Sequence, residues 1–161
     1  MFTLRCTQKL LKKFRIDGQL KSNSPTTTLG DWYANILYSR QGHFIICISE
    51  NSLLPIILSA KDLDRFVPKF IGRIREILIL LDIQAILVET EIEQMNPFYY
   101  GRTKNRVTLG TLSDYMKDLK YMLKLDTAKS ELDWSLYFAE TPCGPLKYRT
   151  SIEVTKELFI G

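Results

Sequence analysis

The stretch WYANILYSRQGHFIICIS, residues 32–49, decides the fold class. Trp32 to Ser39 has the composition of a strand, and His43 to Ser49 is an apolar run with the length of a buried strand. Arg40-Gln41-Gly42 between them is typical of a tight turn. The stretch therefore predicts a β-hairpin, in which His43 is a surface or cross-strand residue rather than a ligand or a base.

Further elements are expected on both sides of the hairpin. Leu53 to Ser59 is apolar and could add a third strand, and Pro55 within it indicates an edge strand or a bulge. From Lys61 onward, apolar residues recur every three and four positions, which is the period of a helix. The other expected strands are Phe2 to Arg5 and Phe98 to Arg102, and the expected helices are Gln8 to Phe14 with Thr7 as N-cap, a helix from about Pro68 with the proline in its first position, Gln84 to Met95, a helix ending near Leu125, Glu131 to Glu140, and Ile152 to Phe159.

Length and composition indicate one globular domain. The chain has 161 residues, of which 45% are apolar, so it can bury a single sizeable core. We find no internal repeat and no linker that would separate two parts. The expected fold class is α+β: a small, mostly antiparallel sheet packed against several helices in one domain over residues 1–161. A Gly-, Ser-, Thr- and Pro-rich segment predicts an exposed, flexible loop near residues 17–30.

Several classes of protein are excluded at this level. The N-terminal segment has no apolar region followed by a small-residue cleavage site, so we predict no signal peptide. No apolar run approaches the length of a membrane span, since charged residues interrupt the longest candidate, residues 70–88. Three scattered cysteines and one histidine argue against a disulfide framework or a zinc site. We therefore expect a soluble, cytoplasmic protein with no membrane partner, no metal and no cofactor.

The charge is unevenly distributed along the chain. The formal net charge is +4, and residues 1–21 hold six basic side chains against Asp17. Residues 102–124 hold six more against two acids, whereas residues 82–94 carry four acids and no base. This asymmetry allows an anionic partner at one face, and it equally allows the two regions to pair with each other.

The segment LGDWYANIL, residues 29–37, is the first candidate site. Gly30 and Asp31 are expected to form a turn, which makes Gly30 a structural residue. Trp32 and Tyr33 then open the strand. Trp32 is either an aromatic anchor of the core or a wall on which a ligand stacks.

The segment TKNRVTLGTLSDY, residues 103–115, is the second candidate. Backbone N–H groups at a helix start attract anions, and side chains suited to capping occur here at Asn105, Thr108 and Thr111. If the chain is extended at residues 102–106, then Arg102, Lys104 and Arg106 form a basic stripe on one face. Alternatively, Arg106 pairs with an acid of the preceding helix, such as Glu91, and serves as the central polar anchor of the fold. Gly110 is expected where close packing excludes a larger side chain.

The segment AETPCGPLKY, residues 139–148, is the third candidate. Pro142 begins a rigid turn and is assigned a structural role. Cys143 is either a nucleophile or a packed thiol. The second reading is favoured because no histidine is near in sequence, and a thiolate without a positive partner would stay protonated. The alternating Glu89, Glu91 and Glu93 predict a solvated helix face rather than a metal site.

These segments resemble a known family. TQKLLKKF, LGDWYANIL, ISENSLLPIIL, TKNRVTLGTLSDY and AETPCGPLKY occur in the same order in a bacterial family of small uncharacterised proteins, the domain of unknown function numbered 6933. More loosely, the chain is similar to a domain of plasmid-borne open-reading-frame proteins with an Asn-Arg-Ser-Val-Leu-Gly-Ser-Met-Asn-Asp hallmark. Residues that keep that hallmark are Arg106, Leu109, Gly110 and Asp114, and residues that depart from it are Thr108, Thr111, Leu112 and Ser113. The resemblance supplies no activity and implies a bacterial cytoplasmic protein of mobile-element origin.

Three functions remain open. The leading hypothesis is a non-enzymatic binding or interaction module for a protein partner or an anionic ligand. The second is a nucleic-acid-associated accessory protein, which requires the N-terminal basic helix and residues 102–124 to share one face. The third is a small hydrolase or transferase that uses Arg106, Asp114 and Glu140 in one pocket. The candidate binding residues are Arg102, Lys104, Asn105, Arg106, Thr111, Asp114 and Trp32.

Overall fold

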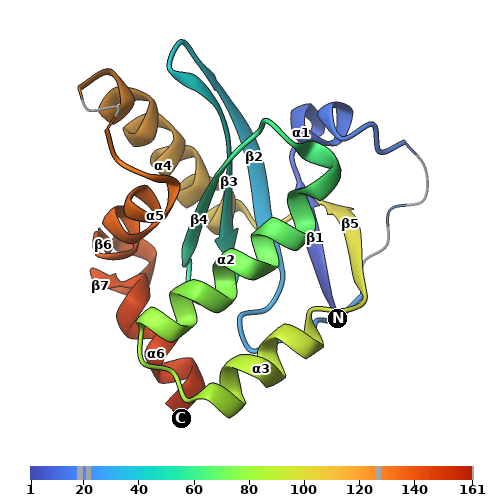
Figure 1. Cartoon of the computed structure of the whole chain (residues 1–161), viewed down its shortest axis with the longest axis vertical. Helices are drawn as coiled ribbons and strands as arrows, with labels where there is room; N and C mark the ends of the chain where they lie inside the picture. The colour runs from blue at the N-terminus through green and yellow to red at the C-terminus, as the bar shows by residue number, and fades with distance from the viewer. Residues whose placement is uncertain (18–19, 21–22, 126–127, 161) are drawn as a thin grey trace.

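A five-stranded sheet forms the centre of the computed structural model, which describes residues 1–17, 20, 23–125 and 128–160. The strand order is β4-β3-β2-β1-β5, with helices on both faces (Figure 1). The expected α+β class is therefore confirmed. The strands of this sheet are β1 (Phe2–Cys6), β2 (Trp32–Ser39), β3 (Gly42–Ser49), β4 (Pro55–Ser59) and β5 (Phe98–Arg102), and the two-residue strands β6 (Pro142–Cys143) and β7 (Arg149–Thr150) pair separately.

The hairpin at residues 32–49 is confirmed. Its strands pair in antiparallel register from Trp32 opposite Ser49 to Ser39 opposite Gly42. β4 extends this antiparallel part as an edge strand with Pro55 as its first residue, as the proline indicated. β1, in contrast, runs parallel to both of its neighbours, β2 and β5. The sheet thus joins an antiparallel hairpin to strands that are far apart in the sequence.

The helices lie close to their expected positions. Pro68 is the third residue of its helix rather than the first, because a short 3₁₀ turn (Leu63–Arg65) leads directly into it. The first turn still suits proline, since its backbone N–H groups have no partner within the helix. The helices are α1 (Gln8–Lys13), α2 (Phe66–Leu80), α3 (Ala85–Gln94), α4 (Arg106–Leu125), α5 (Glu131–Ala139) and α6 (Ser151–Ile160), with a second 3₁₀ turn at Gly144–Leu146.

Alternate residues of β2 face two separate hydrophobic clusters. Trp32 and Ile36 belong to the larger cluster under α1, α2 and α3, whereas Tyr33 and Leu37 belong to the cluster under α4. Trp32 packs edge-on against Phe70 of α2, with 5.0 Å between ring centroids. Because both faces of the hairpin are buried, its register is fixed on both sides.

Helix α5 covers the outer edge of the sheet. The Ile57 backbone N–H of β4 donates to Ser135 Oγ at 2.9 Å, and the Ser59 N–H donates to the Glu131 carboxylate. A capping box between Ser130 and Asp133 fixes the start of this helix. The free donors of the edge strand are therefore satisfied within the chain, which protects that edge from pairing with another strand.

Arg5 and Asp31 form a buried ion pair between the sheet and the segment that precedes β2. Their side chains are 3% and 2% exposed, and Arg5 Nε and Nη2 each lie 3.1 Å from Asp31 Oδ2. Asp31 Oδ1 accepts the Thr3 backbone N–H at 2.8 Å. Arg5 Nη1 donates to the Arg102 carbonyl at 3.0 Å. The pair thus joins β1, the entrance to β2 and the end of β5.

The expected loop near residues 17–30 is exposed only in part. Residues 18–19 and 21–22 lie outside the described residues, so the expected flexibility there stays a prediction. The end of the loop is buried at Thr27, Leu29 and Gly30, which corrects the expectation of an exposed segment. Gly30 has φ +80°, and a Cβ there would lie 2.8 Å from the Asn51 side chain. Glycine is thus required at this turn on both conformational and steric grounds.

Breaking the Arg5–Asp31 pair should destabilise the fold. Asp31→Ala leaves the buried guanidinium without its carboxylate, and we expect the free energy of unfolding to fall by about 3–5 kcal/mol, as measured by urea denaturation. Arg5→Met combined with Asp31→Leu removes both charges. The double variant should lose less stability than the sum of the losses of Arg5→Met alone and Asp31→Leu alone. Asp114→Ala, at an exposed acid, is the control and should stay within about 0.5 kcal/mol of the wild type. Strict additivity of the two single effects would contradict the pairing.

Candidate functional site

The predicted helix entry at residues 103–115 is capped by Asn105. Its Oδ1 accepts the backbone N–H groups of Val107 at 2.9 Å and Thr108 at 3.2 Å. The Asn105 backbone N–H itself donates to the Tyr33 hydroxyl at 3.0 Å, which ties the entry to β2. Two roles are therefore combined in one residue: it starts α4 and fixes α4 against the sheet.

Arg106 is not the internal anchor that the sequence suggested. It is the first residue of α4 and is exposed, as are Arg102 and Lys104. The anchor is Arg5, which sequence reasoning missed. A signal was present, because the alternation of β1 places Thr3 and Arg5 on the face opposite Phe2 and Leu4. A basic residue in a strand that is buried on both faces requires an acid nearby.

Glu91 also departs from expectation. It is 2% exposed rather than solvated, and its carboxylate accepts the backbone N–H groups of Thr28 at 2.7 Å and Leu29 at 3.0 Å. The expected pair between Arg106 and Glu91 is therefore wrong. Burial raises the pKa of Glu91 above its usual value, and the two backbone hydrogen bonds partly oppose that rise. Glu91 holds the segment that carries Asp31.

The other predicted site residues are dispersed. Trp32 is completely buried, so it is a core anchor and offers no stacking wall to a ligand. Thr111 is buried under α4, whereas Asp114 and Glu140 are exposed. Five surface pockets are lined by other residues, and none of them brings Arg106, Asp114 and Glu140 together. The geometry gives no support to a catalytic group built from these three.

Gly110 and Pro142 differ from their expected structural roles, whereas Cys143 matches one of its two readings. Gly110 is exposed on α4 and a Cβ there would meet no neighbour within 4 Å, so the expected close packing is wrong. Pro142 opens the short strand β6 rather than a simple turn. Cys143 beside it is buried, with Sγ 2.8 Å from the Tyr115 hydroxyl. Burial raises the pKa of the Cys143 thiol, which favours the packed-thiol reading over a nucleophile.

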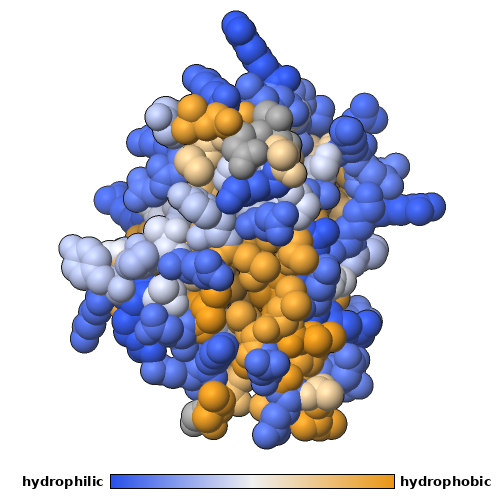
Figure 2. Space-filling view, turned by 60° about the vertical axis from the view of Figure 1, so that its left-hand side comes forward, coloured by the Kyte–Doolittle hydropathy of each residue, from blue (hydrophilic) through white to orange (hydrophobic). Residues whose placement is uncertain are grey.

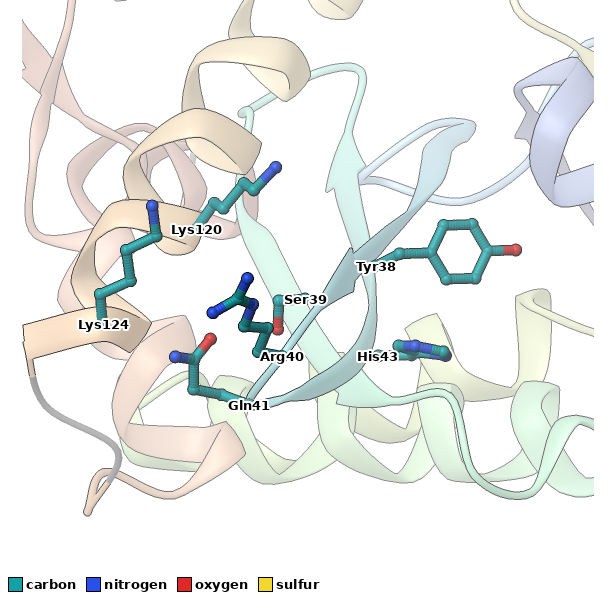
Figure 3. Close-up of a pocket in the computed structure, with 7 residues that line it drawn as sticks. All are labelled: Tyr38, Ser39, Arg40, Gln41, His43, Lys120 and Lys124. Carbon is teal, nitrogen blue, oxygen red and sulfur yellow. The ribbon is translucent and has the colours of Figure 1, made fainter.

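A basic hollow lies at the end of the hairpin (Figure 3). Its volume is about 660 Å³, and it combines the hairpin end with two lysines of α4. Figure 3 shows Arg40 turned toward Lys120 and Lys124, with Tyr38 on the other side of the hairpin. The lining residues are Tyr38, Ser39, Arg40, Gln41, His43, Lys120 and Lys124.

Two further hollows continue this one toward α1. The first shares Tyr38 with it and adds Gln8, Lys9, Lys12 and Lys13. The second shares Lys12 and Lys13 and adds Phe14, Arg15, Leu63, Asp64 and Tyr100. We call the joined area the basic surface, defined by Lys9, Lys12, Lys13, Arg15, Tyr38, Arg40, Lys120 and Lys124. It passes from α1, on one face of the sheet, over the hairpin end to the end of α4 on the other face. The two basic segments are therefore joined around the hairpin end and do not share one face, whereas the nucleic-acid hypothesis expected them to.

The cations of the basic surface are available to a ligand. All seven are exposed, and among the described residues none lies at salt-bridge distance from a carboxylate. Tyr38 is 40% exposed, with Lys9 Nζ 5.5 Å from its ring centroid and the His43 ring packed edge-on at 4.8 Å. His43 is thus the cross-strand residue that the hairpin predicted. The surface therefore presents an accessible aromatic ring together with cations that have no carboxylate partner among the described residues.

The described residues form neither a cluster of metal-binding side chains nor a membrane-spanning helix. Over the described ranges, no group of three or more His, Cys, Asp or Glu side chains is arranged to hold a metal ion. None of the helices in the described part of the chain has the length and hydrophobicity needed to cross a bilayer.

Fold and surface together define a single-domain α+β protein with an exposed basic face. The chain belongs to the family described as Domain of unknown function (DUF6933), whose family model matches residues 3–154. The family resemblance noted in the sequence is thereby confirmed over nearly the whole chain. Neither the curated proteins nor the solved structures include one that matches.

The raised pKa of Glu91 predicts a pH dependence of stability. Above its usual pKa of 4.5 and below its higher value in the fold, the folded chain holds a proton that the unfolded chain has lost. The free energy of unfolding should therefore fall as the pH rises through that window, and this contribution should level off above it. Urea denaturation at a series of pH values measures the slope.

Two variants separate this effect from the rest of the chain. Glu91→Gln keeps an acceptor for the Thr28 or Leu29 N–H but cannot ionise, so the slope due to this residue should disappear. Glu93→Gln changes an exposed glutamate of the same helix and should retain the wild-type slope. An unchanged slope in Glu91→Gln would show that another group titrates in this window.

Proposed function

We propose that this protein is a non-enzymatic binding module whose basic surface binds single-stranded nucleic acid. The observation that carries the proposal is the continuity of the three hollows over the hairpin end, which together hold seven exposed cations and one accessible tyrosine. Phosphate groups along a polynucleotide would pair with the cations. A base would stack on Tyr38.

The arrangement of the surface favours a single strand over a duplex. Figure 1 shows that the hairpin end rises between α1 and the end of α4, so a ligand that contacts both helices must bend over it. A flexible single strand follows such a path without the deformation energy that a stiff duplex would require. Stacking on Tyr38 also requires an unpaired base, since bases in a duplex are already stacked.

The basic stripe at the start of α4 is the competing location. Arg102, Lys104 and Arg106 are exposed and remain candidates for an anion site. Lys120 lies fourteen positions along α4 from Arg106, about 21 Å away at the rise of a helix. The two locations are far enough apart that substitutions in one should not disturb the other.

We further propose that the module acts in a bacterial cytoplasm. The three cysteines are free and buried, which suits a reducing compartment. Nucleic acid is present in that compartment, so an accessory protein encoded by a mobile element could bind it there.

Binding should depend steeply on salt. Fluorescence anisotropy with a labelled single-stranded oligonucleotide of mixed sequence should give an affinity whose logarithm falls linearly with the logarithm of salt concentration. Lys120→Gln combined with Lys124→Gln should reduce the magnitude of that slope by about 1.4, because each phosphate contact on a single strand contributes about 0.7.

Matched variants locate the site. Lys147→Gln removes an exposed lysine outside the basic surface and should leave the slope unchanged. Arg102→Gln combined with Lys104→Gln tests the competing stripe. If this variant reduces the salt slope and the Lys120→Gln, Lys124→Gln variant does not, the site lies at the start of α4. No binding of DNA or RNA even at low salt would refute the proposed function.

Tyr38 should contribute through its ring rather than its hydroxyl. Tyr38→Ala should weaken binding by about 1–3 kcal/mol, the contribution of one base stacked on an aromatic side chain. Tyr38→Phe keeps the ring and should bind like the wild type. Because Tyr38 is partly exposed, thermal unfolding should confirm that both variants remain folded. Equal affinities for the alanine and phenylalanine variants would exclude stacking at this residue.

A further inference from the structure

A second surface of different chemistry lies far from the basic surface, at the end of the molecule where α2 and α6 finish. Figure 2 shows that hydrophobic side chains gather on the lower part of this view, below a largely polar upper part. A hollow of about 590 Å³ opens here between the α2–α3 turn and α6. Its lining residues are Leu81, Asp82, Ile83, Gln84, Leu87, Lys156, Phe159 and Ile160.

The apolar character extends beyond the hollow. Three strongly exposed aliphatic side chains are adjacent in sequence to the lining residues: Ile79 (55%), Leu80 (52%) and Ile86 (70%). The lining residue Ile160 is itself 82% exposed. Ile86 lies away from the buried side of α3, which Val88 and Glu91 occupy. We call the hollow and these side chains the apolar patch.

The size of the apolar patch is that of an interface. The exposed fractions of Ile79, Leu80, Ile86 and Ile160 correspond to roughly 500 Å² per chain, the size of the largest patch on a typical monomer, which is often functional. Two such patches facing each other would bury on the order of 1,000 Å², the lower limit for a specific protein–protein interface.

The charges at the rim indicate what covers the patch. One acid, Asp82, and one base, Lys156, line the hollow from different elements, the α2–α3 turn and α6. A two-fold axis through an isologous interface exchanges such positions, so Asp82 of each chain can face Lys156 of the other. An apolar centre with one acid and one base at its rim is therefore complementary to a second copy of itself.

We infer that a second copy of this chain covers the apolar patch, forming a two-fold symmetric dimer with reciprocal Asp82–Lys156 pairs. This inference does not depend on the proposed function. The patch lies at the opposite end of the sheet from the hairpin end (Figure 1), so the dimer leaves both basic surfaces open.

Light scattering coupled to size exclusion tests the dimer. The wild type should give twice the chain mass of 18.7 kDa, and the mass should fall toward that of one chain on dilution. Ile160→Asp combined with Ile86→Asp should give one-chain mass at concentrations where the wild type is dimeric. Both residues are strongly exposed, so the fold should be retained. Val107→Asp, at an exposed aliphatic residue of α4 outside the patch, is the matched control and should remain dimeric.

Charge reversal tests the proposed partner itself. Asp82→Lys and Lys156→Asp each place like charges across the two-fold axis and should each weaken the dimer at least tenfold, whereas the two together should restore it. Lysine is tolerated at the left-handed Asp82 position, since Lys147 adopts the same conformation in this chain. A wild type that is monomeric at about 100 µM would overturn the inference. A dimer that survives both single reversals and the double isoleucine variant would overturn it as well.

Discussion

The buried Arg5–Asp31 pair is the constraint on which the rest of the structure depends. A charged guanidinium in the interior is tolerated only if its donors are satisfied, and here a carboxylate and the carbonyl of Arg102 satisfy them. These partners lie before β2 and at the end of β5. The pairing of β1 with these two strands is therefore stabilised by the hydrogen bonds of Arg5 as well as by hydrophobic burial. Glu91 of α3 helps to hold Asp31 in place, because its carboxylate accepts hydrogen bonds from the backbone of the segment that ends in Asp31.

The two ends of the molecule carry different surfaces, the basic surface and the apolar patch. The hairpin end carries cations from α1, the turn and α4, and the opposite end carries the apolar patch. Neither surface is contiguous in the sequence: each is assembled from segments that the sheet brings together. A protein with this division can contact a charged ligand at one end and a copy of itself at the other without the two contacts competing for the same residues.

Much of the fold could be predicted from the sequence, and little of the site could. Residues 32–49 and the helical periods after Lys61 are local patterns, and the structure follows them. The parallel pairing of β1 is not local, because its partners in β2 and β5 lie about thirty and nearly a hundred positions away. Because such distant contacts cannot be seen in the sequence, Arg106 was predicted as the polar anchor, whereas the structure has Arg5 in that role. A basic residue beside capping residues is conspicuous in sequence, whereas the partner of Arg5 becomes apparent only when the sheet is assembled.

The position of β1 also has a consequence for biosynthesis. Arg5 leaves the ribosome well before one of its acceptors, the carbonyl of Arg102, which follows nearly a hundred residues later. Until that residue emerges, the nascent chain can form the hairpin and α1, whereas its first strand lacks a neighbour on one side. The long sequence separation of these contacts predicts slow closure of the sheet. During translation the chain would therefore carry an incomplete sheet with an open edge, the state in which chaperones or premature self-association would act on it.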